Sequence, residues 1–288
     1  MTPVQLTTRD DQQAGWRRHH REEAMGTVVT IDLFGDGDAV PEGAYIRLAH
    51  ARAVLRRADA VFSTWNEHSP VSQLRRGEIT VGQAPPEVAA VLGACETARS
   101  LSQGWFDPWA MPEGLDPTGY VKGWAAQRAL DGLAGPGVAG AIVNAAGDIA
   151  TFGCPGTETP FRVGIVDPAD HRRLACVVEL TGAIATSGTY ERGEHLIDPR
   201  TGERQSRVAS ASVTGPDLGL ADALATALAV AGEVGLGFIE PIDGYEGFMI
   251  DRGGSWKSTR HFPFAPTWCA PRPDNAEAVP RRSTKEGN

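Results

Sequence analysis

The hydrophobic pattern of the chain alternates between short apolar runs and longer segments with helical periodicity. Short runs rich in β-branched residues predict strands, and apolar residues that recur every three to four positions predict amphipathic helices. The predicted strands lie at residues 27–34, 138–143, 149–152, 161–166, 176–180, 208–213 and 247–250, and the predicted helices at 41–60, 88–101, 120–134 and 218–231. This mixture predicts an α+β (mixed α/β) fold in which strands are flanked by helices.

Segments rich in turn-forming residues separate these elements. We expect a loop over a pocket at 61–77 and turns at 104–108, 144–148 and 186–189.

The two ends of the chain differ from its centre. Residues 1–23 are polar and mixed in charge, which predicts a poorly ordered arm. Residues 269–288 are rich in Pro, Arg, Glu and Ser, which predicts a disordered tail. Because no repeat and no clear linker interrupts residues 24–268, we expect them to form a single domain of two interlocked lobes.

Composition narrows the function classes. The net charge of −9 argues against a general nucleic-acid binder, and no apolar run approaches the length of a membrane span. The basic N-terminal segment is followed by no apolar stretch, so we expect no secretory signal and a cytoplasmic protein. The four cysteines are scattered without a CxxC pair, which favours free thiols in a reducing compartment over zinc or redox chemistry.

The segment 186–202, TSGTYERGEHLIDPRTG, is the first candidate for chemistry. Its small residues, Thr186 and Ser187 among them, favour turns with exposed amides that suit phosphate binding, although a plain turn is the alternative. His195 is a candidate acid or base near neutral pH. Its apolar neighbours Leu196 and Ile197 leave a half-buried structural histidine as the alternative.

Asp222 and Thr226 lie four residues apart in a predicted helix, so they share one face. A carboxylate and a hydroxyl placed in this way can share a hard cation such as Mg²⁺. The alternative is an exposed aspartate and a threonine that bonds to its own helix backbone.

Two further polar residues stand at predicted element ends. Lys122 follows DPTGY near a helix start, where free amides and a lysine suit an anion, although a solvated surface lysine is the alternative. Asp148 closes the small-residue turn NAAGD, where it can orient a ligand or simply complete a hairpin.

In chain order these segments resemble the ApbE-type FAD:protein FMN transferases. The motifs that carry the resemblance are MGT (25–27), FSTW with Ser69 (62–69), GWFDP (104–108), DPTGYVKGWA (116–125), VNAAGDI (143–149), TSGTYER with HLIDPRTG (186–202) and ADALATAL (221–228). They run from Met25 to about Ile250, which is most of the chain.

The resemblance implies an ApbE-like fold of mixed and antiparallel sheets flanked by helices, with FAD bound between two lobes. It implies a Mg²⁺-dependent enzyme that transfers the FMN part of FAD to a Ser or Thr hydroxyl of a target flavoprotein and releases AMP. The implied metal ligands are Asp222, Thr226 and a backbone oxygen near Val121. The implied FAD-binding residues are Met25, Trp65, Phe106, Asp107, Asp116, Lys122, Ala125, Asp148, Thr186, Ser187 and Ile197. His195, or Asp198 close by, would accept the proton of the acceptor hydroxyl.

The chain departs from the family pattern at four positions. Ala146 replaces one of a pair of glycines, Trp65 a tyrosine, Arg75 an asparagine and Ala225 a serine. None of these changes removes an implied ligand.

Two other functions stay open at this stage. Water could replace the acceptor hydroxyl, which would give an FAD pyrophosphatase that releases FMN and AMP. The chain could also be a non-catalytic FAD-binding protein. The identity of the acceptor, the physiological metal and the oligomeric state do not follow from the sequence.

Overall fold

The computed structural model describes residues 15–155, 160–188, 196–204 and 207–266. In this part of the chain an antiparallel sheet has the strand order β1-β2-β3-β4-β7-β8-β9-β10, and β5 and β6 form a second, two-stranded sheet. The strands are β1 (Trp16–Ala24), β2 (Thr27–Gly35), β3 (Gly140–Ala145), β4 (Asp148–Gly153), β5 (Phe161–Val166), β6 (Leu174–Leu180), β7 (Ala183–Gly188), β8 (Val208–Gly215), β9 (Glu246–Asp251) and β10 (Trp256–Ser258).

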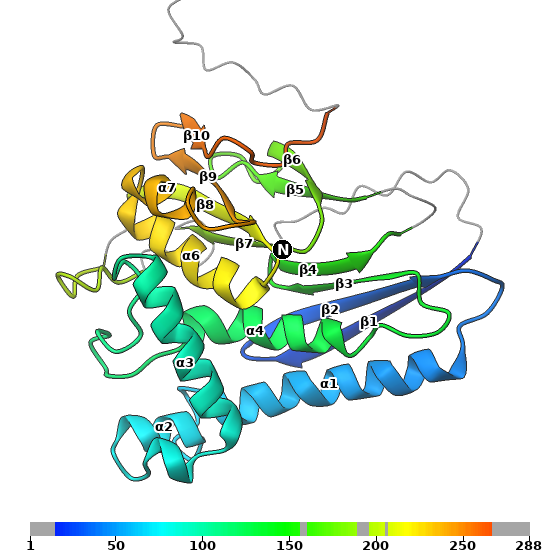
Figure 1. The fold of residues 1–288 in the computed structure, drawn as a ribbon, viewed down its shortest axis with the longest axis horizontal. Coiled ribbons are helices and arrows are strands. Elements are labelled where there is room, and N and C mark those ends of the chain that lie inside the picture. The colour runs from blue at the N-terminus through cyan, green and yellow to red at the C-terminus, as the bar shows by residue number, and fades with distance from the viewer. Residues whose placement is uncertain (1–14, 156–159, 189–195, 205–206, 267–288) are drawn as a thin grey trace, which may run out of the picture.

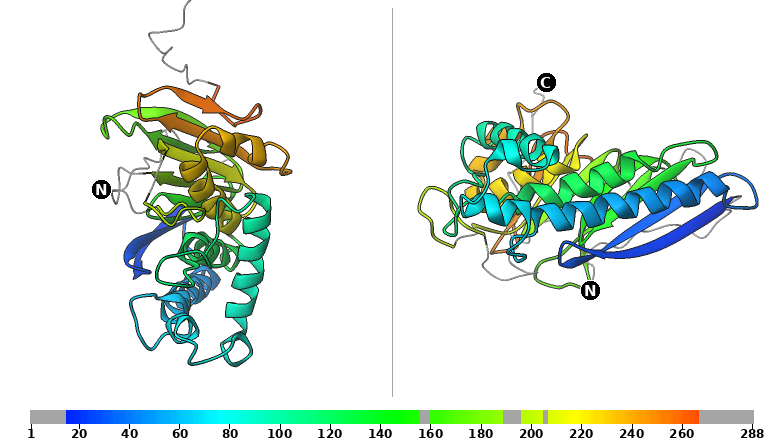
Figure 2. Two further views of the ribbon diagram at one scale, coloured as in Figure 1. Left: turned by 90° about the vertical axis from the view of Figure 1, so that its left-hand side faces the viewer. Right: turned by 90° about the horizontal axis from the view of Figure 1, so that it is seen from below.

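The helices cover one face of the large sheet (Figures 1 and 2). They are α1 (Glu42–Phe62), α2 (Pro70–Arg75), α3 (Pro86–Leu101), α4 (Thr118–Asp131), α6 (Leu218–Ala231) and α7 (Val234–Ile239), with a short 3₁₀ turn at Val81–Gln83. Helix α6 packs on β7 and β8, and α4 packs on β3 and β4.

The alternation of side chains across the strands produces two hydrophobic cores. Val29, Ile31 and Leu33 of β2 point toward the helices and join the larger core. Ile142 of β3 points to the other face and joins a smaller core shared with β5 and β6, to which Phe161 belongs. The β5–β6 sheet therefore covers part of the face that the helices leave free.

Most sequence-based elements are confirmed. The strand predicted at 161–166 and the helix predicted at 218–231 have the observed bounds, and the remaining predicted elements differ by a few residues at their ends. None of the helices in the described ranges is long and apolar enough to cross a membrane.

The flexible arm predicted for residues 1–23 is wrong from Trp16 onward, because Trp16–Ala24 forms β1. This strand carries the polar sequence WRRHHREEA, so its hydrophobic pattern is too weak to reveal it. Residues 1–14 and the predicted C-terminal tail 269–288 lie outside the described residues.

One predicted loop and one predicted turn are also corrected. Residues 70–75 of the expected loop form α2, which begins where Ser69 Oγ accepts a hydrogen bond from the Ser72 amide. Residues 186–188 of the expected turn 186–189 are the end of strand β7 and pair with β8. Alternating small residues are compatible with either state, and the neighbouring strands decide between them.

A buried carboxylate joins β1 to α1. Glu22 accepts hydrogen bonds from Arg52 Nε at 2.7 Å and Arg56 Nε at 2.6 Å, and His20 lies at 3.1 Å. Burial raises the pKa of Glu22, but these hydrogen bonds outweigh it and lower the pKa to about 2. The polar strand is therefore held to α1 by charge-assisted hydrogen bonds in addition to its buried Trp16.

Helices α4 and α6 are in close contact because small residues face each other. A side chain at Gly123 would place its Cβ 2.4 Å from the Leu218 carbonyl oxygen and 3.0 Å from Asp222 Cβ. Only glycine fits here, since real Cβ atoms do not approach so closely. The packing of α4 against α6 in the core thus depends on the absence of a side chain at Gly123.

We predict that Gly123→Ala lowers the free energy of unfolding by about 2 kcal/mol, because the new methyl group overpacks the contact with α6. Gly93→Ala is the matched control, since Gly93 is exposed in α3 with open space around it. That control should gain about 0.5–1 kcal/mol from helix propensity. Denaturant unfolding followed by circular dichroism measures both, and equal effects of the two substitutions would contradict the packing account.

We also predict that Glu22→Gln lowers the free energy of unfolding at pH 7 by about 1–3 kcal/mol, because it leaves Arg52 and Arg56 without their carboxylate. A folded-state pKa below the ordinary 4.5 means that this stability is present above about pH 4.5 and is lost as the pH falls toward 2. The difference between wild type and variant should therefore shrink over that range, whereas an exposed Glu240→Gln control should show little difference at any pH. A difference that is constant from pH 7 to pH 2 would contradict the assignment.

Candidate functional site

The candidate site forms where α4, α6, β4 and β7 meet, which brings together residues far apart in the sequence (Figure 1). Helix α6 contributes Asp222 and Thr226, α4 contributes Lys122, β4 contributes Asp148, and β7 contributes Ser187. The sequence predicted each of these five residues as a ligand contact, and the structure brings them together in two polar groups, Lys122 with Asp148 and Asp222, and Thr226 with Ser187.

Lys122 lies between two buried carboxylates. Its Nζ contacts Asp148 Oδ2 and is 3.7 Å from Asp222 Oδ2. The Gly123 amide donates a hydrogen bond of 3.1 Å to the same Asp222 oxygen. The alternatives of a solvated lysine and an exposed aspartate are therefore wrong: Asp222 is buried and Lys122 is largely covered.

Asp148 is fixed from both sides. Its Oδ1 accepts the Thr186 amide at 3.1 Å, and its Oδ2 contacts Lys122. The turn that precedes it has two residues in the left-handed region, Ala146 at φ 53° and Gly147 at φ 97°. The alanine that departs from the family pattern thus occupies a strained position, which costs about 1 kcal/mol relative to glycine.

Hydroxyl groups extend the cluster toward β7. Thr226 Oγ1 lies 3.2 Å from Ser187 Oγ, and Thr186 Oγ1 lies 2.8 Å from Ser212 Oγ. Thr226 therefore bonds across to another element, in addition to any bond within its own helix. These hydroxyl oxygens lie near the buried carboxylate of Asp222 and could serve as metal ligands with it.

Gly119 is a neighbour of this cluster that the sequence did not reveal. A Cβ built on Gly119 would lie 3.7 Å from Thr226 Oγ1 and 3.3 Å from the Phe106 ring. This places Phe106, a predicted flavin contact, beside the same turn of α4. Val121 and Ala125 are buried in the packing of α4, and Ala125 has no exposed surface.

The loop between α3 and α4 holds Asp107 and Asp116 through local bonds. Asp107 accepts hydrogen bonds from Arg99 Nε at 2.7 Å and from the Trp109 amide at 2.9 Å. Asp116 accepts the amide and the hydroxyl of Thr118 at the start of α4. Arg75, another departure from the family pattern, donates to the Leu115 carbonyl at 2.8 Å and lies 3.5 Å from Asp116. It therefore anchors this loop to α2.

The segment 196–204 contacts the same loop. Asp198 is buried, and its carboxylate accepts the Arg200 amide at 2.9 Å, so it shapes its own turn. The Arg200 guanidinium lies 3.5 Å from the centroid of the Trp105 ring, a cation–π contact that the sequence did not predict. Ile197 is partly buried and forms a β-bridge with Arg204. His195 lies outside the described residues.

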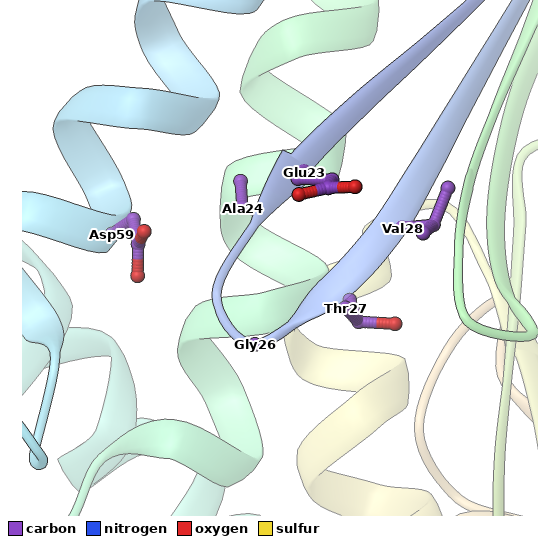
Figure 3. Close-up of a pocket in the computed structure, with 6 residues that line it drawn as sticks. All are labelled: Glu23, Ala24, Gly26, Thr27, Val28 and Asp59. Carbon is purple, nitrogen blue, oxygen red and sulfur yellow. The ribbon is translucent and has the colours of Figure 1, made fainter.

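Two predicted flavin contacts lie near the C-terminal end of α1. Met25 has φ 54° in the tight turn between β1 and β2. Beside this turn is an open pocket of about 350 Å³ lined by Glu23, Ala24, Gly26, Thr27, Val28 and Asp59, shown in Figure 3. Trp65 is 94% exposed in the loop after α1, so its ring does not line a formed slot.

The donor chemistry of the cluster restricts which metal it could hold. The described residues contain no group of three or more His, Cys, Asp or Glu side chains placed to share a metal ion. Asp222, Thr226 and Ser187 instead offer one carboxylate and two hydroxyl oxygens. Hard oxygen donors of this kind suit Mg²⁺, which keeps several positions for water and ligand phosphates.

Comparisons with solved structures concern the fold. The flavin transferase ApbE from Vibrio cholerae superposes with a TM-score of 0.73 at 21% identity, covering 85% of this chain and 96% of that one. The apo form of Pseudomonas stutzeri flavinyl transferase ApbE gives 0.72 at 24% identity, covering 87% and 96%. The predicted ApbE-like fold is confirmed.

Comparisons of the sequence identify the family. An FAD:protein FMN transferase of Rhodobacter capsulatus is 40% identical over 128 residues, which are 41% of this chain and 24% of that protein. One of Vibrio cholerae serotype O1 is 35% identical over 130 residues, 41% of this chain and 39% of that protein. The matched regions thus span less than half of the length of these curated relatives. The model of the ApbE family matches residues 25–114 and 110–249, which together are most of the sequence, and the chain therefore belongs to the ApbE family.

Proposed function

We propose that this protein is an FAD:protein FMN transferase that uses Mg²⁺ to attach the FMN part of FAD to a Ser or Thr hydroxyl of a flavoprotein. In this reaction the acceptor oxygen forms a bond to the FMN phosphorus, and the bond from that phosphorus to the bridging oxygen breaks. AMP leaves with the bridging oxygen, and the acceptor loses its hydroxyl proton. The names of the sequence relatives support this proposal.

The observation that carries the proposal is the convergence of Lys122, Asp222 and Thr226 at the contact of α4 and α6. Transfer of a phosphoryl group needs positive charge near the phosphate oxygens and an ordered approach of the acceptor. Lys122 supplies one positive charge, and the oxygen cluster at Asp222 and Thr226 can hold a second. Because Lys122 is matched by two carboxylates, Asp148 and Asp222, the cluster would attract a pyrophosphate only with a divalent cation bound.

The residues fit Mg²⁺, and Gly119 is a better candidate than Val121 for the backbone ligand. A Cβ built on Gly119 would lie 3.7 Å from Thr226 Oγ1, so the Gly119 backbone lies next to a proposed metal ligand. We therefore propose that Asp222, Thr226 and the Gly119 carbonyl hold the ion, which when bound would neutralise charge on the transferred phosphoryl group.

The other residues would position the flavin and the acceptor. Phe106 beside Gly119 offers an apolar wall for the isoalloxazine ring. Asp148 orients Lys122 and the Thr186 amide, which faces the same cluster. We propose His195 as the group that accepts the hydroxyl proton, because the buried Asp198 carboxylate is engaged in its own turn.

The direct test incubates the full chain with FAD, Mg²⁺ and a flavoprotein domain with an exposed Ser or Thr, then follows flavin fluorescence of the denatured acceptor and AMP release. A fluorescent acceptor band with matching AMP is expected. AMP without labelling would indicate a pyrophosphatase, and intact FAD with neither product would indicate a flavin-binding protein.

We predict that Asp222→Asn slows transfer at least about a hundredfold, which corresponds to about 3 kcal/mol of lost charge stabilisation. Asparagine keeps the size of the side chain and an oxygen acceptor for the Gly123 amide, so folding should be retained. Asp217→Asn is the matched control, because Asp217 caps the same helix and asparagine caps equally well. Full activity of Asp222→Asn at ordinary Mg²⁺ concentrations would refute the metal assignment.

A further inference from the structure

Strand β1 has an unpaired edge. It pairs with β2 over all nine of its residues without a register shift, and it stands at the end of the strand order of the large sheet. Among the described residues no strand pairs with its outer side, and Figure 2 shows it at the margin of the ribbon. Long, regular edge strands of this kind are templates for pairing with another chain.

The hairpin geometry fixes which backbone groups face outward. The turn consists of Met25 and Gly26, both with positive φ, as in a type I′ turn. Ala24 and Thr27 therefore form the first hydrogen-bonded pair, and every second residue back along β1 bonds to β2. The alternate residues, which are Arg17, His19, Arg21 and Glu23, direct their amides and carbonyls away from the sheet.

The charges along β1 change sign from one end to the other. Basic residues occupy positions 17, 18 and 21, and Glu22 and Glu23 follow. When a second β1 pairs antiparallel about a twofold axis at His20, Arg17 lies opposite Glu23 of the other copy, and by symmetry the reverse pair also forms. Opposite charges at facing positions stabilise strand pairs.

The alternative registers are less favourable. A shift that keeps the outward groups facing each other moves the pairing by two residues. In one direction Arg17 would face Arg21, and in the other Arg21 would face itself. Like charges at facing positions are destabilising, so these two shifts are less favourable than the register centred on His20.

The side chains that would meet lie on the partly exposed face of β1, where Arg17 and His19 also contact Asp32 of β2 at 2.9 and 3.0 Å. The face of β1 turned away from α1 carries Arg17 and His19, whose side chains are 43% and 49% exposed, and Glu23 is also exposed. The opposite face of the strand is occupied by α1, where Glu22 binds Arg52 and Arg56. Edge charges of a single sign would repel a second copy, whereas this strand complements itself.

We propose that β1 pairs antiparallel with β1 of a second copy of this chain, about a twofold axis at His20, and joins the two sheets into one. The interface is isologous, so each contact occurs twice. This inference is independent of the transferase reaction, because it rests on the sheet edge alone.

Light scattering coupled to size exclusion, on the full chain over a range of concentrations, tests the dimer. The mass should rise to that of two chains. Glu23→Lys places a positive charge opposite Arg17 twice in the dimer and should weaken it roughly tenfold or more. Glu240→Lys makes the same charge change on the exposed end of α7 and should leave the dimer intact.

A proline substitution tests the backbone contact. Arg21→Pro removes an outward amide without breaking a bond to β2, which edge strands tolerate. It should give a folded monomer, whereas Arg21→Thr should remain dimeric. A monomeric wild type at every concentration, or a dimer that survives both Glu23→Lys and Arg21→Pro, would overturn the proposal.

Cross-linking tests the register. In the proposed pairing residue 20 faces itself, so His20→Cys should form a disulfide-linked dimer on oxidation. Arg18→Cys should not, because the two residues would lie about 13 Å apart. Wild type provides the blank for the natural cysteines, of which Cys95 and Cys176 are buried. Cross-linking at position 18 but not at 20 would overturn the register.

Discussion

The close contact between α4 and α6 is the constraint on which the candidate site depends. Because Gly123 has no side chain, Asp222 can approach the backbone of α4 and accept its amide at 3.1 Å. The same approach places Lys122 of α4 within 3.7 Å of the Asp222 carboxylate. A larger residue at position 123 would separate the two helices and remove both contacts together.

The strands behind the helices complete the arrangement. Asp148 at the start of β4 and Ser187 in β7 reach the cluster from neighbouring strands of one sheet, so their spacing is set by the strand pairing. The carboxylates and hydroxyls are held by bonds to fixed backbone or side-chain groups before any ligand binds. Such preorganisation is what charge stabilisation during phosphoryl transfer requires.

The sequence predicted the parts of this site that depend on local pattern. The four-residue spacing of Asp222 and Thr226 in an apolar helix places both on one face whatever the tertiary structure. The proximity of Lys122, Asp148 and Ser187 became visible only through the family motifs, since contacts between distant elements leave no local pattern. Gly119 was missed for the same reason, because its role depends on the helix that packs against it.

Strand β1 shows where reasoning from hydrophobic pattern fails. Its Glu22 is a polar residue that is buried because Arg52 and Arg56 of α1 bind it. The cation–π contact of Arg200 with Trp105 is a second example, since nothing in either motif indicates that they meet. Tertiary contacts, and not local propensity, determine the burial and the partners of these residues.

Calorimetric titration of Mg²⁺ into the FAD-bound protein tests the assignment of the cation site most directly, because it separates metal binding from turnover. Wild type should bind Mg²⁺, and Asp222→Asn should bind it at least about tenfold more weakly, a loss of about 1.4 kcal/mol, while FAD still binds. Equal Mg²⁺ affinity in the two proteins would show that the ion does not bind at the contact of α4 and α6.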